Sequence, residues 1–346
     1  MNIFDIAKET GYSIATVSRA INNSGYVSEK TREKIMKVIE EKNYSVNAFA
    51  RGMATSSMSL AGIISTDSRD MYQAECIYYL QKALKENGYT SLLTCSGTQL
   101  ADKQEAAAML LSRNVDVIFL IGSQFVEARP KDNQYLRNAA AKVPVILLNG
   151  TLKGENIYSL RCDDEAGGYE LSSLVLEQGS ENPLMVIRRK TYSSASKIRG
   201  FERACRKAGI DPEGRIAETS QEDGALPDLS KALQDRAFDS LICADDELAA
   251  AALKYCQKNN LSVPEQVQVT GYNNSSLALI APLEITSYDN RIEFLCSGAV
   301  SMMNQIFDKK ELPEDSVYAG KIFPRQTTRS EKALEPESEE AEMLLF

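Results

Sequence analysis

The sequence predicts a fold in two parts: a small all-α domain at the N-terminus and a larger α/β body with parallel sheets. Three observations predict it. Apolar residues recur at helical spacing within residues 3–43. From Leu60 onward, short apolar runs alternate with amphipathic helices, which is typical of parallel sheets covered by helices on both faces. A polar segment, residues 43–59, separates the two patterns.

The N-terminal segment predicts three short helices. An apolar stripe over residues 3–7 marks the first helix, which Gly11 ends. Ser13 can cap a second helix over residues 14–21, and Ser28 can cap a third. Three short helices joined by tight turns form a helix-turn-helix unit.

The body predicts two series of strands and helices. The expected strands are 60–65, 90–95, 115–122, 143–149, 157–162, 183–187, 239–244, 267–272 and a late strand near 317–323. The expected helices are 71–87, 101–113, 133–142, 164–178, 194–208, 226–235, 245–259 and 291–307. The last residues, 330–346, are acidic and lack periodicity, so we expect a disordered tail there.

Composition excludes several classes of protein. No apolar run approaches the roughly 20 residues of a membrane-spanning helix, and the N-terminus lacks a secretory pattern, so we expect a cytoplasmic protein with no membrane contact. The chain has no histidine, and its seven cysteines form no CxxC pair. This excludes the usual zinc patterns and every Ser-His-Asp site. We therefore expect no metal, no cofactor and no enzymatic activity, and we expect most cysteines to lie in the core.

Charge is distributed unevenly along the chain. The whole sequence carries a net charge of −9. Residues 1–56 contain eight Lys or Arg and six Asp or Glu, a net charge of +2, which leaves −11 for the remainder. A mildly basic segment on an acidic body is typical of a protein that approaches nucleic acid through that segment alone.

The N-terminal segment resembles the DNA-binding head of the lac-repressor (LacI/GalR) family. The matching residues read IFDIAKETGYSIATVSRAINNSGYVSEKTREKI, followed by NYSVNAFARGMAT. The likeness continues more weakly to about residue 329, through DMYQAE, CDDEAGGYE, SKIRGFERA, ICADDELA and FPRQTTR. The resemblance implies a helix-turn-helix head, residues 1–45, and a hinge helix and linker, residues 46–59.

The resemblance also implies a periplasmic-binding-protein-like body, residues 60–329, in which two doubly wound lobes bind ligand and support dimerisation. Three crossovers would join these lobes. Lobe one would hold about 60–158 and 290–318, and lobe two about 159–288 and 319–329.

The second helix of a helix-turn-helix lies in the major groove of DNA. Arg19 can donate two hydrogen bonds to a guanine, and Ile14 and Ala15 can contact thymine methyl groups. Thr16, Ser18 and Asn22 suit phosphate oxygens, although Thr16 and Ser18 can equally be helix surface or caps. Two half-sites require a homodimer and a near-palindromic operator.

The linker resembles the family's paired hinge helices, which enter the minor groove. The residues that match this pattern are Asn47, Ala50, Arg51 and Met53. Met53 stands where an apolar side chain would open the central base step, although it can equally be a packed interdomain residue. Val46 and Ala54 depart from a frequent proline and a frequent basic residue, which weakens the match.

A cleft between two α/β lobes is the expected site of a small effector, at the carboxyl ends of the strands. By resemblance the effector-binding residues are Asp67, Tyr72, Ser123, Gln124, Asp163, Lys197, Asp245, Asn273 and Tyr288. Carboxylates, amides and a tyrosine suit a sugar or sugar derivative. Lys197 replaces a usual arginine and can pair with Asp245, and Asp163 can instead simply cap the helix that follows it.

Several alternatives stay open at this point. The effector can release DNA as an inducer or strengthen binding as a corepressor, and a phosphoprotein partner is neither indicated nor excluded. A sugar-binding transport protein would fit the body alone. An α/β enzyme would need a motif such as GxxxxGK[ST], GxGxxG or GxSxG, and none is present.

Overall fold

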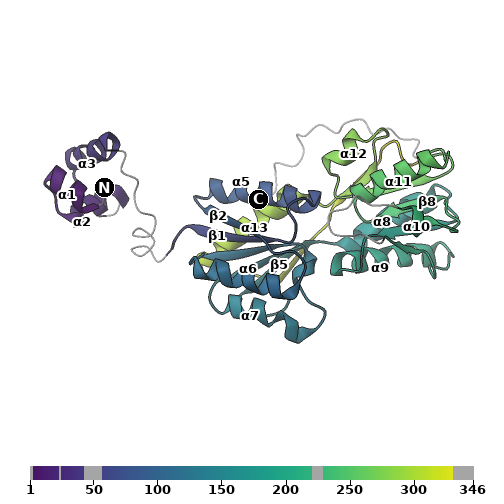
Figure 1. Ribbon diagram of the computed structural model, residues 1–346, viewed down its shortest axis with the longest axis horizontal. Helices are drawn as coiled ribbons and strands as arrows, with labels where there is room; N and C mark the ends of the chain where they lie inside the picture. The colour runs from purple at the N-terminus through teal and green to yellow at the C-terminus, as the bar shows by residue number, and fades with distance from the viewer. Residues whose placement is uncertain (1–2, 23–24, 43–56, 220–228, 330–346) are drawn as a thin grey trace. The chain divides into compact units, whose positions relative to one another are not determined.

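The computed structural model describes residues 3–22, 25–42, 57–219 and 229–329. The chain divides into two compact units (Figure 1). The smaller unit consists of residues 1–60 with 114–116, and the larger unit consists of the remainder.

Three helices form the head: α1 (Ile3–Thr10), α2 (Ile14–Asn22) and α3 (Glu29–Glu41). Each helix contributes one fully buried side chain to a shared core, namely Ile6, Val17 and Ile35. Helices this short are marginal alone in water, so this common core holds them together. The predicted three-helix head is confirmed.

The larger unit contains two six-stranded sheets, one in each lobe. The sheet of lobe one has the order β11 (Asp315–Tyr318), β5 (Ile157–Cys162), β4 (Val145–Leu148), β3 (Val117–Ile121), β1 (Leu60–Ser65), β2 (Thr90–Cys95). The sheet of lobe two has the order β12 (Lys321–Phe323), β10 (Thr286–Asp289), β9 (Gln268–Tyr272), β8 (Ser240–Cys243), β6 (Pro183–Ile187), β7 (Ile216–Glu218). Central strands such as β3 are buried along their whole length, as expected for parallel strands covered on both faces.

Helices cover both faces of each sheet. In lobe one, α5 (Met71–Glu86) and α13 (Ile292–Phe307) pack on one face, and α6 (Leu100–Ser112) and α7 (Gln134–Ala140) lie on the other (Figure 1). In lobe two, one face carries α8 (Asp164–Glu177) and α9 (Tyr192–Lys207), and the other carries α10 (Ser230–Leu233), α11 (Asp246–Lys258) and α12 (Ser276–Ile280). Two short 3-10 helices, η1 (Ser123–Phe125) and η2 (Pro130–Asn133), follow β3. The predicted architecture of two doubly wound lobes is confirmed.

The chain crosses between the sheets three times: after β5, after β10, and between β11 and β12. Because β5 belongs wholly to the first sheet, the first crossing follows Cys162 rather than residue 158. The late strand expected near 317–323 is in fact two strands, one in each sheet. Between them, a Cβ on Gly320 would lie 2.3 Å from the carbonyl oxygen of Asp289, so only glycine fits there.

Some elements escaped prediction because they are short: β7 has three residues, β10 four and α12 five. β7, β10 and α12 were not predicted. Only parallel strands were expected, whereas β12 runs antiparallel to β10. In β10, buried Thr286 donates its backbone N–H to the Thr327 hydroxyl at 2.9 Å. Such hydrogen bonds stabilise β10, although its polar side chains do not predict a buried strand. Of the helix expected over 226–235, the described residues contain only α10, which ends at Leu233. Residues 220–228 and the expected acidic tail lie outside the described residues.

Candidate functional site

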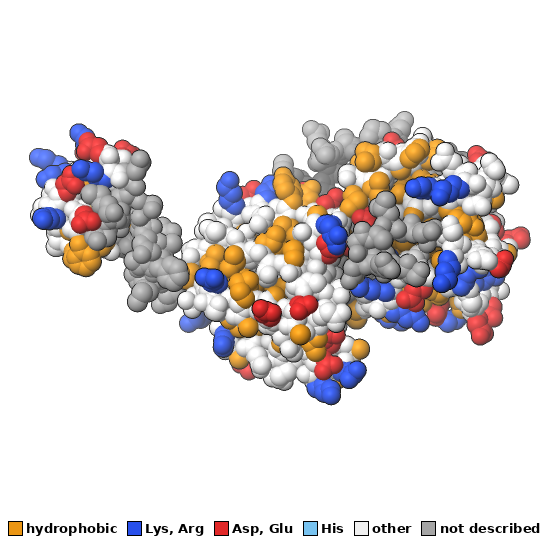
Figure 2. Space-filling view, viewed as in Figure 1, with side chains coloured by type: hydrophobic (Ala, Val, Ile, Leu, Met, Phe, Trp, Pro, Cys, Tyr) orange, Lys and Arg blue, Asp and Glu red, His pale blue; other side chains and the backbone are white. Residues whose placement is uncertain are grey.

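The second helix of the head presents one face to its core and the other to solvent. Val17 and Ala20 point inward and are 0% and 2% exposed. Ile14, Ala15 and Arg19 are exposed on the opposite surface. Figure 2 shows several Lys and Arg side chains on the head, with acidic ones beside them. This is the arrangement that a helix needs to contact a groove with its outer face.

The polar side chains of α2 are partly engaged within the helix. The Ser13 hydroxyl accepts a hydrogen bond from the backbone N–H of Thr16 at 3.1 Å and lies 2.9 Å from the Thr16 hydroxyl. Thr16 and Ser18 are half-buried. Asn22 is the last residue of α2, but its side chain is not among those described, and the hinge candidates Asn47, Ala50, Arg51 and Met53 also lie outside the described residues.

Tyr26 is a surface residue of the head that the sequence analysis missed. It follows α2 and is 92% exposed, the most exposed large hydrophobic side chain described in the head. Gly25 beside it has φ of +67°, and a Cβ there would lie 3.5 Å from Cδ of Arg19. The Arg19 side chain therefore passes close to Gly25, the residue before Tyr26. An aromatic residue directly after the sequence Asn-Asn-Ser-Gly was the available signal.

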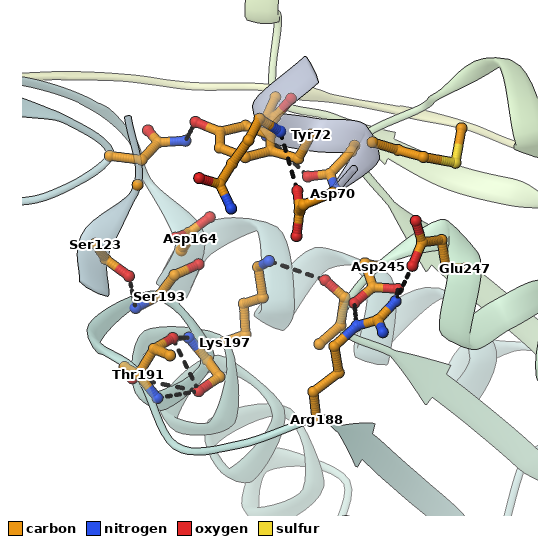
Figure 3. Close-up of a pocket in the computed structure, with 18 of the residues that line it drawn as sticks. Asp70, Tyr72, Ser123, Asp164, Arg188, Thr191, Ser193, Lys197, Asp245 and Glu247 are labelled. Carbon is orange, nitrogen blue, oxygen red and sulfur yellow. Dashed lines mark hydrogen bonds and ion pairs between the residues drawn. The ribbon is translucent and has the colours of Figure 1, made fainter. Parts of the chain in front are cut away.

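A cavity of about 170 Å³ lies between the two lobes of the body. Its walls come from the carboxyl ends of strands and from the helix starts that follow them, and most of the lining residues have polar side chains (Figure 3). Six predicted effector residues line it: Tyr72, Ser123, Gln124, Lys197, Asp245 and Asn273. The topology thus brings residues from both lobes to one place.

Three predicted residues do not line this cavity. Asp163 accepts a hydrogen bond from the backbone N–H of Ala166 at 3.0 Å, so it caps α8. Asp67 accepts two hydrogen bonds from the guanidinium of Arg69, at 2.8 and 3.0 Å.

Tyr288 is fully buried within lobe two. Its hydroxyl accepts the backbone N–H of Gly320 at 2.9 Å, and its ring stacks on Tyr272. Tyr288 therefore belongs to the core behind the cavity rather than to its surface.

Arg188 is the main cavity residue that the sequence analysis missed. It follows β6 and donates two hydrogen bonds to Asp245, at 2.8 and 3.0 Å, and a third to Glu247 (Figure 3). Burial alone would lower the pKa of this guanidinium, but the two carboxylates outweigh burial and raise it. Asp245 also caps α11 through the backbone N–H of Leu248 at 2.8 Å.

Lys197 does not pair with Asp245, contrary to the possibility raised from the sequence. Its Nζ donates to the carbonyl oxygen of Ala244 at 3.0 Å and lies 3.6 Å from the centre of the Tyr272 ring. Because Arg188 already occupies both oxygens of Asp245, Lys197 is held by a carbonyl and an aromatic face instead.

Lobe one contributes neutral polar groups. The Tyr72 hydroxyl accepts a hydrogen bond from Nδ2 of Asn149 at 2.6 Å. Nε2 of Gln124 donates to the Thr66 hydroxyl at 2.7 Å. Burial raises the pKa of Tyr72 well above its usual range, so this phenol stays protonated.

Two carboxylates in the cavity are held in unusual electrostatic surroundings. Burial raises the pKa of Asp246 to about 6, against hydrogen bonds from Ser287 and Ser275. Burial also raises the pKa of Asp70, to which repulsion by Asp245 adds. The cavity therefore combines carboxylates with basic side chains and neutral donors, a chemistry that suits hydroxyl-rich ligands.

Nothing among the described residues suggests a metal centre or a membrane segment. No group of three or more His, Cys, Asp or Glu side chains in the described part could hold a metal ion. Within the same residues, no helix combines the length and apolar character required to span a bilayer.

Comparisons with known sequences agree with this two-part organisation. A family model described as bacterial regulatory proteins of the lacI family matches residues 2–47, and a periplasmic binding protein-like domain matches residues 174–328. An HTH-type transcriptional regulator of Lachnoclostridium phytofermentans is 35% identical over 333 residues, covering 95% of this chain and 99% of that protein. The regulator RegA of Clostridium saccharobutylicum is 26% identical, covering 94% and 99%.

Solved structures share the fold at lower identity. A lac repressor dimer bound to operator and the anti-inducer ONPF has a TM-score of 0.83 and 18% identity, covering 95% of this chain and 99% of that chain. A complex of the regulator CelR with cellobiose has a TM-score of 0.66 and 20% identity, covering 94% and 99%. The chain therefore belongs to the lacI family of bacterial regulatory proteins, which are DNA-binding transcriptional regulators and not enzymes.

Proposed function

We propose that the protein represses transcription by binding a near-palindromic operator as a homodimer, and that a sugar-like effector in the cleft controls operator affinity. The observation that carries this proposal is the pairing, in one chain, of an outward-facing α2 with a polar cavity between two lobes. Acting on operator DNA would place the protein in the cytoplasm.

In this proposal the head contacts DNA through Ile14, Ala15, Thr16, Ser18, Arg19 and Asn22. Arg19 would discriminate guanine, since a guanidinium can donate to O6 and N7 of that base together. Tyr26 would contact DNA near the end of α2, because it is the most exposed large hydrophobic side chain described in the head. The hinge, residues 46–59, would contact the minor groove through Asn47, Ala50, Arg51 and Met53.

The cavity supports a polyhydroxylated effector. Hydroxyl groups of a sugar could donate to the carboxylates and accept from Gln124 and Lys197, while Tyr72 could contact the sugar face. Two relatives in fold are described as complexes with carbohydrates: CelR with cellobiose, and a regulator from Alkaliphilus metalliredigens with D-xylulofuranose. Effector binding would bias the lobes between two arrangements, and this bias would change operator affinity.

A homodimer would align two heads with two half-sites. The lac repressor relative is described as a dimer on its operator. On the body described here, α12 exposes Leu279 and Ile280, which are 53% and 75% exposed. These apolar side chains are candidates for a contact between copies.

Replacing Arg19 tests the head. Arg19→Ala should reduce discrimination between a duplex selected by the wild-type chain and a scrambled duplex by about tenfold, the loss of one bidentate base contact. Lys37→Ala is the matched control, because Lys37 is 76% exposed on α3 rather than on α2. It should weaken binding to both duplexes equally. Fluorescence anisotropy measures both, and unchanged selectivity in Arg19→Ala would refute the proposed contact.

A ligand screen tests the cleft. Melting temperature would be measured with cellobiose and with neutral and acidic monosaccharides, since a saturating ligand stabilises the folded state by mass action. Any sugar that raises the melting temperature would then be titrated into the operator complex. A sugar that binds the body but leaves operator affinity unchanged would sink the proposed coupling.

A further inference from the structure

One carboxylate holds the residues that lead from the linker into the body. Oδ1 of Asp116 accepts the backbone N–H of Met58 at 3.0 Å. Its Oδ2 accepts both the hydroxyl of Ser57 and the backbone N–H of Leu60, each at 3.0 Å. The backbone N–H of Asp116 in turn donates to the carbonyl oxygen of Leu60 at 2.7 Å. Four hydrogen bonds therefore join Asp116 to three of the four residues 57–60.

The hydrogen bonds of Asp116 lie at the point where the linker meets the first strand of the body. Leu60 begins β1, and Asp116 directly precedes β3, which pairs with β1 in parallel. Residues 114–116 group with residues 1–60 as one compact unit, although α6 before them and β3 after them belong to the larger unit. Asp116 thus lies where the chain passes from the linker into the first sheet.

Lobe two contains an equivalent arrangement, in which Asp239 accepts hydrogen bonds from the segment before a neighbouring strand. Asp239 directly precedes β8, and its carboxylate accepts the backbone N–H groups of Glu181 and Asn182, at 2.7 and 3.0 Å, and the hydroxyl of Ser180. Its own N–H donates to the carbonyl oxygen of Asn182 at 3.1 Å. As in lobe one, an aspartate ahead of one strand holds the segment that enters the neighbouring strand, here β6.

The two aspartates differ in what they hold. The segment held by Asp239 connects α8 to β6 and stays inside lobe two. The segment held by Asp116 is preceded in sequence by the linker and the head. Equivalent hydrogen bonds therefore lie within one lobe in the first case, and directly after the linker in the second.

We infer that Asp116 is a positioning residue for operator binding: it fixes the end of the linker to the first sheet, so that the heads are presented at a defined spacing. The inference rests on the proposed binding of operator DNA by paired heads. A head attached through a looser segment would still contact DNA, but paired heads would lose part of their preorganisation for two half-sites.

The sharpest variant is Asp116→Asn. The amide keeps the size of the carboxylate but replaces one accepting oxygen with a donating NH2 group. The NH2 group would face either the N–H of Met58 or the two groups that donate to Oδ2, the Ser57 hydroxyl and the Leu60 N–H. At least one hydrogen bond is therefore lost. Asp239→Asn is the matched control, because it makes the same chemical change in the equivalent place of lobe two, at a residue that is also half-buried.

Three measurements on the full-length chain test the inference: melting temperature, hydrogen–deuterium exchange at Met58 and Leu60, and anisotropy with a duplex that the wild-type chain selects from random DNA. Asp116→Asn should speed exchange at these two amides and weaken binding to the selected duplex about tenfold, which corresponds to about 1.4 kcal/mol. Affinity for a scrambled duplex should stay unchanged. Asp239→Asn should lower the melting temperature by about as much as Asp116→Asn does. It should leave wild-type values for the exchange at Met58 and Leu60 and for the affinity for the selected duplex.

Wild-type affinity of Asp116→Asn for the selected duplex would overturn the inference, and so would an equal loss of affinity in Asp239→Asn. Unchanged exchange at Met58 and Leu60 would overturn the clamp itself, whatever the DNA result. Failure of the wild-type chain to select any duplex would instead refute the proposed operator binding, and the exchange measurement would still decide whether Asp116 holds the linker end.

Discussion

The two walls of the cleft differ in charge. Among the described lining residues, lobe one contributes a single charged side chain, Asp70, beside neutral groups such as Tyr72 and Gln124. The charged lining residues of lobe two are Asp164, Arg188, Arg189, Lys197, Asp245, Asp246 and Glu247. Lobe two therefore contributes most of the charged side chains of the site, and lobe one contributes mainly neutral hydrogen-bonding groups.

This difference indicates how the lobes share the work of binding. Taking charges out of water is costly unless partners compensate them, and in lobe two Arg188 already compensates Asp245 and Glu247. Closing a mostly neutral wall over a ligand requires less desolvation. We therefore expect substitutions in lobe two to affect stability more than those in lobe one.

The largest effect should come from Arg188→Ala. It leaves Asp245 and Glu247 partly buried without a counter-charge, so the free energy of unfolding should fall by about 3 kcal/mol. Arg206→Ala is the control: Arg206 is 62% exposed in its ion pair with Glu202, and its loss should cost less than about 1 kcal/mol. Urea unfolding followed by circular dichroism measures both. Equal losses would contradict the assignment of a compensated charge cluster to lobe two.

A second effect should appear as a pH dependence of stability. The pKa of Asp246 is raised to about 6 from its ordinary value of 3.8, chiefly by burial. Between these values the folded chain holds a proton that the unfolded chain has released, so this residue's contribution to the free energy of unfolding falls as pH rises from about 4 to 6 and then levels off. Asp246→Asn has no proton to release.

Over that pH range the difference in unfolding free energy between wild type and Asp246→Asn should change by an amount on the order of 2 kcal/mol. Asp102 is exposed on α6 of lobe one, so Asp102→Asn should leave the wild-type slope intact. If Asp246→Asn keeps the wild-type slope, the buried carboxylate is not the group that titrates.

The smallest effect should come from lobe one. Tyr72→Phe removes the hydroxyl that accepts the hydrogen bond from Asn149 and should lower the free energy of unfolding by about 1 kcal/mol. Tyr78→Phe is matched in chemistry, but Tyr78 is 63% exposed on the same helix and should show no change. A loss at Tyr72 as large as that at Arg188 would abolish the contrast between the walls.

Periodicity was sufficient to predict the long elements of the fold. The head helices, the central strands and helices such as α5 and α8 all have apolar patterns that only one element type explains. It failed for β10, which is short and is stabilised by partners distant in sequence, such as Thr327, and it did not separate β11 from β12. The lobe boundary at residue 158, which the resemblance implied, was wrong, because the sheet that receives β5 depends on β4 and β11.

The candidate site was partly predictable for a different reason. Residues that follow parallel strands meet at one edge of a sheet, so Ser123 and Asp245 could be expected near a cleft. Arg188 could not be assigned, since its pairing with Asp245 requires β6 and β8 to be neighbours in the sheet. Tyr288, which the resemblance assigned to the effector site, lies within β10 and is buried beside Gly320, a contact visible only in three dimensions.

The three crossings between lobes have a consequence for synthesis on the ribosome. The head is complete after about 42 residues, whereas the sheet of lobe one lacks its edge strand β11 until residue 318 has been made, and that of lobe two lacks β12 until residue 323. A nascent chain therefore carries a finished head long before either lobe can close. Premature termination anywhere in between would release heads without a complete body. Under the proposed function, such fragments could contact operator half-sites but could not respond to an effector.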